Sequence, residues 1–295
     1  MEWLILLLLV PAILVPIVLL CGFAGCSFSH GLVPGPPDAP TVTATPKNVD
    51  HITVSWQNTD PGPVVGYRFV RTGGTLPPRD ENVDASITTV EDTTGLDPDT
   101  VYTYEVSTVT EDGTSNPGTV MANTFRTVLN VDPATTTPQT VAPGNYCFVQ
   151  RIPAGQLLAG GSKVGIKVSG SPAGNVTINR IYISRARAAL GTPGINDWDS
   201  DTDITPVRTL PLTLPNDIPI DLEPIDYTLG QAQDLIIAFD FTATSSAGNI
   251  RFFPKPGVTL YFKAGVQQAS LPTRDSDYIT QPDPRLYLVV TIGVP

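Results

Sequence analysis

Short apolar–polar alternations separated by turn-forming residues run through most of this chain. In residues 52–56 and 101–106, for example, every second side chain falls on the same face, which is the period of a β-strand. The 295 residues include 30 prolines and 25 glycines, which interrupt helices and favour turns. Long amphipathic stretches of helical period are absent from the sequence beyond the N-terminal segment. The sequence therefore predicts an all-β body with many turns.

The N-terminus carries an apolar run of a different kind. Residues 3–25 contain no charged side chain. A helix of this length, at about 1.5 Å of rise per residue, just spans a bilayer core of roughly 30 Å. We expect residues 1–28 to be a membrane-directed apolar helix, and residues 29–40, which are rich in Pro and Gly, to be a stiff spacer.

Three fates of this leader stay open. A cleaved signal peptide has a basic start and a shorter apolar stretch of about 7–15 residues, whereas here only Met1 and the acidic Glu2 precede the apolar run. The residues before Cys26 resemble the lipobox of bacterial lipoproteins, which implies acylation of Cys26, although Phe23 departs from that pattern. An uncleaved helix would contain Pro11 and Pro16, which bundled membrane helices tolerate. Length and spacer favour retention at a membrane, with the body exposed outside a bacterial cell, in its periplasm or on a virion.

Charge and cysteine content exclude several classes of function. The net charge of −11 and the pI near 4.5 argue against a nucleic-acid partner, which needs a basic patch. Apart from Cys21 and Cys26 in or beside the apolar run, the only cysteine is Cys147. A lone cysteine allows no disulfide within the body and no cysteine metal cluster. We expect Cys147 to face a core.

Residues 41–128 form the first predicted module. Its alternating runs are residues 41–44, 52–56, 67–70, 87–90, 101–106 and 120–125. The sequences PDAPTVTAT, ITVSW, VVGYRFVRTGG and TTGLDPDTVYTYEVSTVTEDGTSNP resemble a fibronectin type III domain over about residues 37–127. The resemblance implies that Trp56 is the buried tryptophan of the second strand and that Tyr102, six residues after Leu96, is the corner tyrosine. The resemblance implies a fold and not a ligand, because the family's Arg-Gly-Asp loop is absent. Residues 79–81, Arg-Asp-Glu, lack its glycine and are predicted to be a solvated loop.

Residues 129–295 form the second predicted module. Its candidate strands are residues 146–152, 163–168, 176–185, 234–241, 257–263 and 285–292. Within residues 176–185 the apolar face shifts by one position, which predicts a β-bulge near Asn179 and Arg180. Residues 285–292 are apolar on both faces, as in a central strand. Eight or more such strands predict a jelly-roll-like β-sandwich.

The order of these runs resembles accessory jelly-roll domains found beside bacterial and phage carbohydrate esterases. The resemblance lies in KVGIKVSGSPAGNVTINRIYISRA followed by LTLPNDIPIDLEPIDYTLGQAQDLIIAFDF. It is a likeness of pattern, and none of the esterase catalytic motifs accompanies it. It implies at most a glycan-facing or assembly module.

The distribution of catalytic residue types argues against an enzyme. Both histidines, His30 and His51, precede the second module, which therefore cannot contain a Ser-His-Asp or Cys-His arrangement. A glycosidase needs two opposed carboxylates, and the second module has a single glutamate, Glu223. Glu223 with Asp221 or Asp226 is the remaining candidate for a hydrolase; the alternative is a solvated acidic turn.

One segment concentrates acidic residues at alternate positions. Ca²⁺ takes six to eight oxygen ligands, and carboxylates that converge on one side of a loop can supply them. The spacing resembles the start of an EF-hand loop, but Thr202 and Arg208 occupy its glycine and glutamate positions. The segment is thus either a calcium site or a hydrated acidic loop. The four candidate ligands are Asp197, Asp199, Asp201 and Asp203.

Trp198 lies within this acidic segment and is the only tryptophan of the second module. An exposed indole could stack on a sugar ring, whereas a partly buried one anchors a loop. We therefore predict a membrane-anchored, surface-displayed, non-enzymatic structural or adhesion protein of a bacterial envelope or phage virion, with protein partners or self-assembly. The alternative is a glycan-binding module with its ligand near Trp198.

Overall fold

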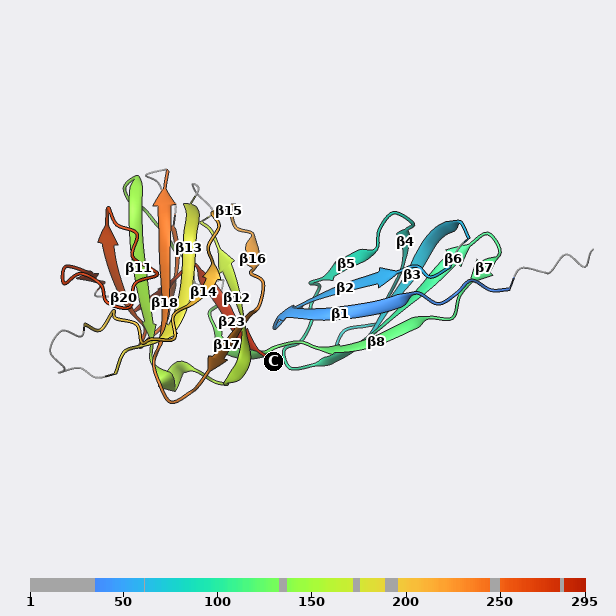
Figure 1. The fold of residues 1–295 in the computed structure, drawn as a ribbon, viewed down its shortest axis with the longest axis horizontal. Coiled ribbons are helices and arrows are strands. Elements are labelled where there is room, and N and C mark those ends of the chain that lie inside the picture. Colours follow the sequence, from blue (N-terminus) through green and yellow to red (C-terminus); the bar gives the residue numbers. More distant parts are fainter. Residues whose placement is uncertain are drawn as a thin grey trace, which may run out of the picture.

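The computed structural model describes residues 35–60, 62–132, 137–171, 176–188, 196–244, 250–281 and 284–295. Two β-sandwiches lie end to end and give an elongated molecule (Figure 1). The chain enters the first sandwich at the end away from the second, and the C-terminus lies where the two meet. The predicted leader, with Cys26, lies outside the described residues. Within the described ranges, no helix has the length and apolar character needed to cross a membrane.

The first sandwich consists of two antiparallel sheets. One has the order β1-β2-β5; the other has the order β4-β3-β6-β7, with β8 also paired to β6. The strands are β1 (Thr41–Asn48), β2 (His51–Gln57), β3 (Val64–Gly73), β4 (Arg79–Asp84), β5 (Thr89–Asp92), β6 (Val101–Thr110), β7 (Gly113–Thr114) and β8 (Gly118–Asn123).

The core of this sandwich is formed by the alternate apolar residues of its strands. Trp56 of β2 is buried and lies edge-on to Tyr67 of β3, with 5.3 Å between ring centroids. Tyr102 and Tyr104 alternate with half-buried residues along β6 and are fully buried. The hydroxyl oxygen of Tyr102 accepts a 2.7 Å hydrogen bond from the backbone N–H of Asp97, which is the geometry of a tyrosine corner. The predicted roles of Trp56 and Tyr102 are therefore confirmed.

The prediction of a loop at residues 79–81 is wrong. These residues begin β4, an edge strand that pairs only with β3 in the described structure. The guanidinium of Arg68 on β3 donates two hydrogen bonds to the carboxylate of Asp80, at 2.9 and 2.6 Å. The charged sequence suggested a loop, but charges are common on edge strands because they discourage pairing with other chains.

The second sandwich is larger and is also antiparallel. Besides one short 3₁₀ helix, Ala154–Gln156, it contains strands only within the described residues. The strands are β9 (Arg126–Asn130), β10 (Thr137–Gln139), β11 (Gly144–Ile152), β12 (Gly161–Ser169), β13 (Val176–Arg185), β14 (Thr205–Arg208), β15 (Leu212–Leu214), β16 (Pro219–Asp221), β17 (Ile225–Leu229), β18 (Leu235–Ala243), β19 (Ile250–Pro254), β20 (Thr259–Ala264), β21 (Ile279–Thr280), β22 (Arg285–Tyr287) and β23 (Val289–Val294).

Two layers enclose the main core of the second sandwich. The larger sheet has the order β14-β13-β18-β11-β20-β21, and the opposite layer contains β16-β12-β23-β9 and β10-β19-β22. The pairing of β13 with β18 shifts register between Ile178 and Arg180, which confirms the predicted bulge. The single strand predicted at residues 285–292 is instead two strands, because Leu288, with a φ of 63°, ends β22, which pairs with β19. The second of them, β23, is buried along its whole length and lies between β12 and β9, as expected for a central strand. The described chain is thus an all-β protein built of sandwiches, whereas the jelly-roll assignment stays a prediction.

The larger sheet is buried on its outer face as well. Cys147 of β11 and Ala238 of β18 lie there in an apolar cluster that includes Ala269 and Tyr278 of a covering segment. The buried carboxylate of Asp240 accepts a 3.0 Å hydrogen bond from the backbone N–H of Ala269 and so fixes that segment. Cys147 is fully buried, as predicted, and burial together with the charge of Asp240 raises its pKa to about 12. Cys147 is therefore a core residue.

Two glycines form the seat on which the first sandwich rests. Gly165 of β12 and Gly293 of β23 are cross-strand partners. A Cβ atom at Gly165 would lie 2.6 Å from the carbonyl oxygen of Lys47, and one at Gly293 would lie 2.8 Å from a methyl carbon of Val49. Only glycine allows this approach without displacing the β1–β2 turn.

Replacing Tyr102 by Phe tests the tyrosine corner. The change keeps the buried ring but leaves the N–H of Asp97 without its acceptor, so we expect the first sandwich to lose about 1–2 kcal/mol of stability. Hydrogen exchange of peptides from β3 and β6, measured by mass spectrometry, reports this local free energy. Tyr67→Phe is the control, because the buried Tyr67 makes no hydrogen bond through its hydroxyl within the described residues. Equal effects of both changes would contradict the role given to Tyr102.

Candidate functional site

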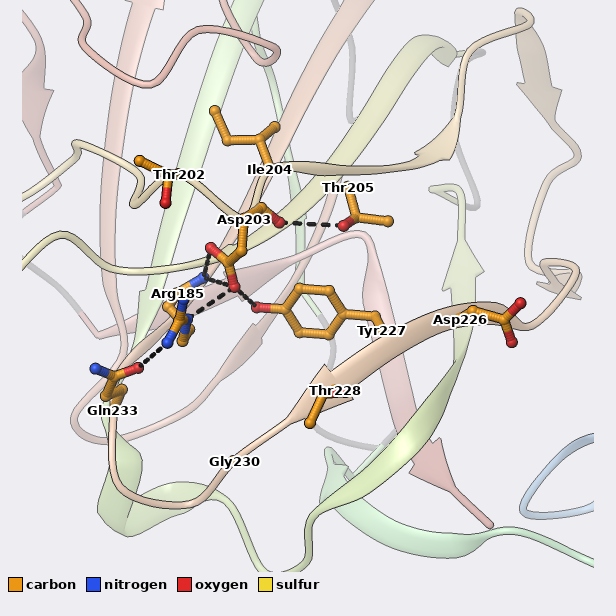
Figure 2. Close-up of a pocket in the computed structure, with 10 residues that line it drawn as sticks. All are labelled: Arg185, Thr202, Asp203, Ile204, Thr205, Asp226, Tyr227, Thr228, Gly230 and Gln233. Carbon is orange, nitrogen blue, oxygen red and sulfur yellow. Dashed lines mark hydrogen bonds and ion pairs between the residues drawn. The ribbon is translucent and has the colours of Figure 1, made fainter.

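An open cleft of about 570 Å³ lies on the second sandwich (Figure 2). One wall comes from the segment that leads into β14 and contains Thr202, Asp203 and Thr205. The other wall comes from β17 and the turn after it, with Asp226, Tyr227, Thr228, Gly230 and Gln233. Arg185, the last residue of β13, lies between them. The cleft therefore joins segments that are far apart in the sequence.

Asp203 organises this cleft. One carboxylate oxygen accepts the backbone N–H of Arg185 at 3.0 Å, and the other accepts the Nε–H of Arg185 at 2.9 Å and the hydroxyl of Tyr227 at 2.8 Å. Burial and the adjacent Asp203 raise the pKa of Tyr227, so its phenol is protonated and donates. The guanidinium of Arg185 also donates a 3.2 Å hydrogen bond to Gln233. These bonds hold Arg185 in one orientation.

The chemistry of the lining favours neutral, hydroxylated ligands over anions. Arg185 is the only cation among the residues that line the cleft, against the carboxylates of Asp203 and Asp226. A further carboxylate, that of Asp201, lies 3.5 Å from the guanidinium. Threonine hydroxyls and the Gln233 amide can both donate and accept hydrogen bonds, as sugar hydroxyls do. The cleft contains neither histidine nor cysteine, and Figure 2 shows Asp226 pointing away from Asp203.

The four aspartates of the predicted calcium site do not converge. Asp197 lies 3.4 Å from a guanidinium nitrogen of Arg151. Asp199 is buried and accepts the backbone N–H of Arg274 at 3.0 Å. Asp201 and Asp203 both face Arg185.

Each of these carboxylates thus has a protein donor. Within the ranges that the structure covers, no group of three or more His, Cys, Asp or Glu side chains is placed to hold a metal ion. The calcium site therefore stays a prediction for which the described geometry gives no support.

Trp198 is half-buried and packs against the covering segment of the larger sheet. Its indole stacks on Tyr278, with 5.6 Å between centroids and 24° between planes, and lies 5.4 Å from the ring of Tyr261. The indole N–H donates a 3.1 Å hydrogen bond to the carbonyl oxygen of Asp275. This is the geometry of a loop anchor. Trp198 does not line the cleft, so a glycan at Trp198 and a ligand in the cleft are separate hypotheses.

The carboxylates considered for hydrolysis lie in two different places. Asp221 and Glu223 face the first sandwich, where Asp221 contacts His51 at 2.9 Å and Glu223 forms an ion pair with Lys47. Asp226 lies at the rim of the cleft with its side chain 92% exposed. The described structure therefore gives Asp221 and Glu223 roles in joining the two sandwiches, and Glu223 does not line the cleft.

Sequence reasoning missed the residues that shape the cleft. Arg185 is the last residue of a correctly predicted strand, and Tyr227 and Gln233 follow a segment interpreted as an acidic turn. No local motif connects them, because they meet only through the pairing of β13, β14 and β17 with their neighbours. The one available signal was Asp203, the last member of the aspartate series.

Residues 35–124 match the sequence model of the fibronectin type III domain. This part of the chain is similar to the FN5 domain of Drosophila Lar, with 28% identity over 30% of this chain and 96% of that chain and a TM-score of 0.25. It is also similar to an FN3 domain of human collagen XX, with 22% identity over 31% of this chain and 98% of that chain and a TM-score of 0.27. No curated protein matches the chain significantly. The predicted fibronectin type III domain is thus confirmed.

Asp203→Asn tests whether Asp203 organises the cleft. The change weakens the charge-assisted hydrogen bonds from Arg185 and Tyr227, so we expect the second sandwich to lose about 1.5–3 kcal/mol of stability. Asp226→Asn alters an exposed carboxylate of the same cleft and should change stability by less than about 0.5 kcal/mol. Chemical denaturation of both variants, resolved by hydrogen exchange of peptides from β13 and β17, measures the difference. A loss as large for Asp226→Asn as for Asp203→Asn would contradict this assignment.

Proposed function

We propose that this protein is a surface-displayed, non-enzymatic structural or adhesion protein, in which the fibronectin type III domain holds the second sandwich away from a membrane. The observation that carries the proposal is the end-to-end docking of the two sandwiches (Figure 1). A fixed spacer needs its two attachment points at opposite ends. The chain enters the first sandwich at one end, and the second sandwich docks at the other.

The connection between the sandwiches is short and is built into a sheet. Only Thr124 and Phe125 separate β8 from β9, and β9 pairs with β23 of the second sandwich. Phe125 is buried beside Gly165 and Gly293. A linker that is itself a paired strand leaves little freedom for one domain to rotate relative to the other.

Polar contacts across the junction restrict that freedom further. The side-chain amide of Asn48 donates a 2.8 Å hydrogen bond to Asp221, and Lys167 forms an ion pair with Asp50. Exposed ion pairs contribute only about 0–1 kcal/mol each. Several such polar contacts around a packed interface nevertheless define one orientation of the two sandwiches, because each contact constrains a different direction of movement.

The membrane part of the proposal rests on the apolar run of residues 3–25. Placed before the fibronectin type III domain, an anchor there would put the second sandwich farthest from the bilayer. The body would then face the outside of a bacterial cell, its periplasm or a virion surface. Self-assembly or protein partners of the second sandwich would complete a structural or adhesive role.

Expression of the full chain in a bacterial host tests display. We expect the protein in the membrane fraction, and the second sandwich accessible to an added antibody on intact cells or after the outer membrane is opened. The intact mass then identifies an acylated Cys26, an unprocessed Met1 or an unmodified internal start. A control without residues 3–25 should stay in the soluble cytosolic fraction. A full chain that stays there too would contradict the proposal.

Glycan binding is the second candidate, and the polar lining of the cleft favours it. We expect binding on a glycan array to be lost in Gln233→Ala, which removes an amide from the lining without touching a core. Trp198→Ala is the matched test of the other hypothesis and should leave binding intact if the ligand occupies the cleft. Loss in Trp198→Ala alone, in a variant that is still folded, would place the ligand at the indole. Absence of binding to any glycan would remove this candidate.

A further inference from the structure

His51 lies between carboxylates of both sandwiches. It is the first residue of β2, at the end of the first sandwich that faces the second. Its Nδ1 atom lies 2.9 Å from a carboxylate oxygen of Asp221, which belongs to β16 of the second sandwich. Its Nε2 atom lies 2.7 Å from a carboxylate oxygen of Glu91 on the neighbouring strand β5. The ring thus has an acceptor at each nitrogen.

Only a protonated ring satisfies both contacts. Ionised carboxylates accept and do not donate, and a neutral imidazole has a single N–H. Burial by itself lowers the pKa of His51, but the hydrogen bonds and negative charges of Asp221 and Glu91 outweigh it and raise that pKa above 6.5. Loss of one ring proton leaves either Asp221 or Glu91 opposite a nitrogen lone pair.

The ring proton of His51 affects the charge balance of the whole junction. Lys47 of β1 pairs with Glu223, and Lys167 of β12 lies between Asp50 and Asp221. With a neutral ring, these two ammonium groups face the four carboxylates of Asp50, Glu91, Asp221 and Glu223, an excess of two negative charges. The imidazolium reduces this excess to one.

Asp221 cannot relieve the imbalance by turning to water. Its side chain is only 10% exposed, whereas that of Glu91 is 55% exposed. Asp221 is also the member of the pair that belongs to the second sandwich. A neutral ring keeps one N–H, which can stay on Nδ1 opposite the buried Asp221 while the exposed Glu91 turns to water. The contact between the two sandwiches then loses the positive charge of its donor and weakens.

We propose that His51 is a pH-sensitive latch of the junction: its imidazolium holds the two sandwiches in one orientation, and deprotonation loosens their docking. The latch depends on the geometry of the junction and not on where the protein is displayed. It makes the orientation of the two sandwiches depend on the pH around the junction.

The direction of the pH dependence follows from the raised pKa of His51. Stabilisation by the imidazolium is fully present below the ordinary histidine pKa of about 6.5 and is lost as the pH rises through the higher pKa of the docked state. At acid pH, burial alone would raise the pKa of Asp221, but its hydrogen bond from His51 and the charge of Lys167 lower it below 3.8. The latch is therefore closed at mildly acid pH and opens as the pH rises through the raised pKa of His51.

Distance measurements between two spin labels test the latch in the full chain held in detergent micelles. Met121→Cys on the first sandwich and Leu210→Cys on the second provide two sites that are each 69% exposed. Cys21 and Cys26 are replaced by Ser, and the buried Cys147 stays unlabelled. We expect a narrow distance distribution at mildly acid pH that broadens as the pH rises through the pKa of His51, which NMR of its ring nitrogens measures in the same protein.

Two variants make the outcome decisive. His51→Gln should give the broad distribution at every pH. Glu91→Gln should move the transition to lower pH, because the glutamine oxygen can still accept a hydrogen bond but one of the two negative charges that raise the pKa of His51 is removed. Urea denaturation confirms that both sandwiches remain folded in each variant. A wild-type distribution that stays the same while His51 titrates, or a His51→Gln variant that keeps the pH response, would overturn the proposal.

Discussion

Close approach of two backbones decides how the halves of this protein meet. Gly165 and Gly293 lie opposite each other on neighbouring strands and leave the sheet without side chains at that point. The β1–β2 turn fits there, with Val49 and Phe125 against the bare strands. The polar pairs around this seat then lie within hydrogen-bonding distance. Because exposed ion pairs stabilise little by themselves, their geometry depends on the packed glycine seat, and the arrangement of the whole molecule depends on it in turn.

Burial of the larger sheet on both faces explains why its acidic and aromatic residues serve structure. Segments that cover an apolar sheet must satisfy their own backbone groups. Asp199 accepts the N–H of Arg274, Asp240 accepts that of Ala269, and Trp198 stacks on Tyr278. Residue types that indicate a metal or sugar site in a sequence are thus already engaged in fixing these segments. Asp203 is the exception, since it both fixes Arg185 and faces an open cleft.

Sequence reasoning worked where a pattern is local. The resemblance to a fibronectin type III domain placed Trp56 and Tyr102 in a core, and a one-residue change of phase located the bulge between Ile178 and Arg180. It failed at β4, whose charged residues resemble a loop, and at the short strands β14 to β17. Those strands contain too few residues to show the apolar–polar alternation of a β-strand. They form because longer strands offer them unpaired edges for hydrogen bonding. The cleft and the junction could not be predicted for the same reason, since His51 and Asp221 are 170 positions apart.

The junction and the cleft share one strand. β12 contains Gly165 and Lys167, which contact the first sandwich, and it also pairs with β16 and with β17. β16 ends at Asp221 in the junction, and β17 begins one residue before Asp226 at the rim of the cleft. β12 therefore both contacts the first sandwich at the glycine seat and pairs with β17, the strand that forms one wall of the cleft.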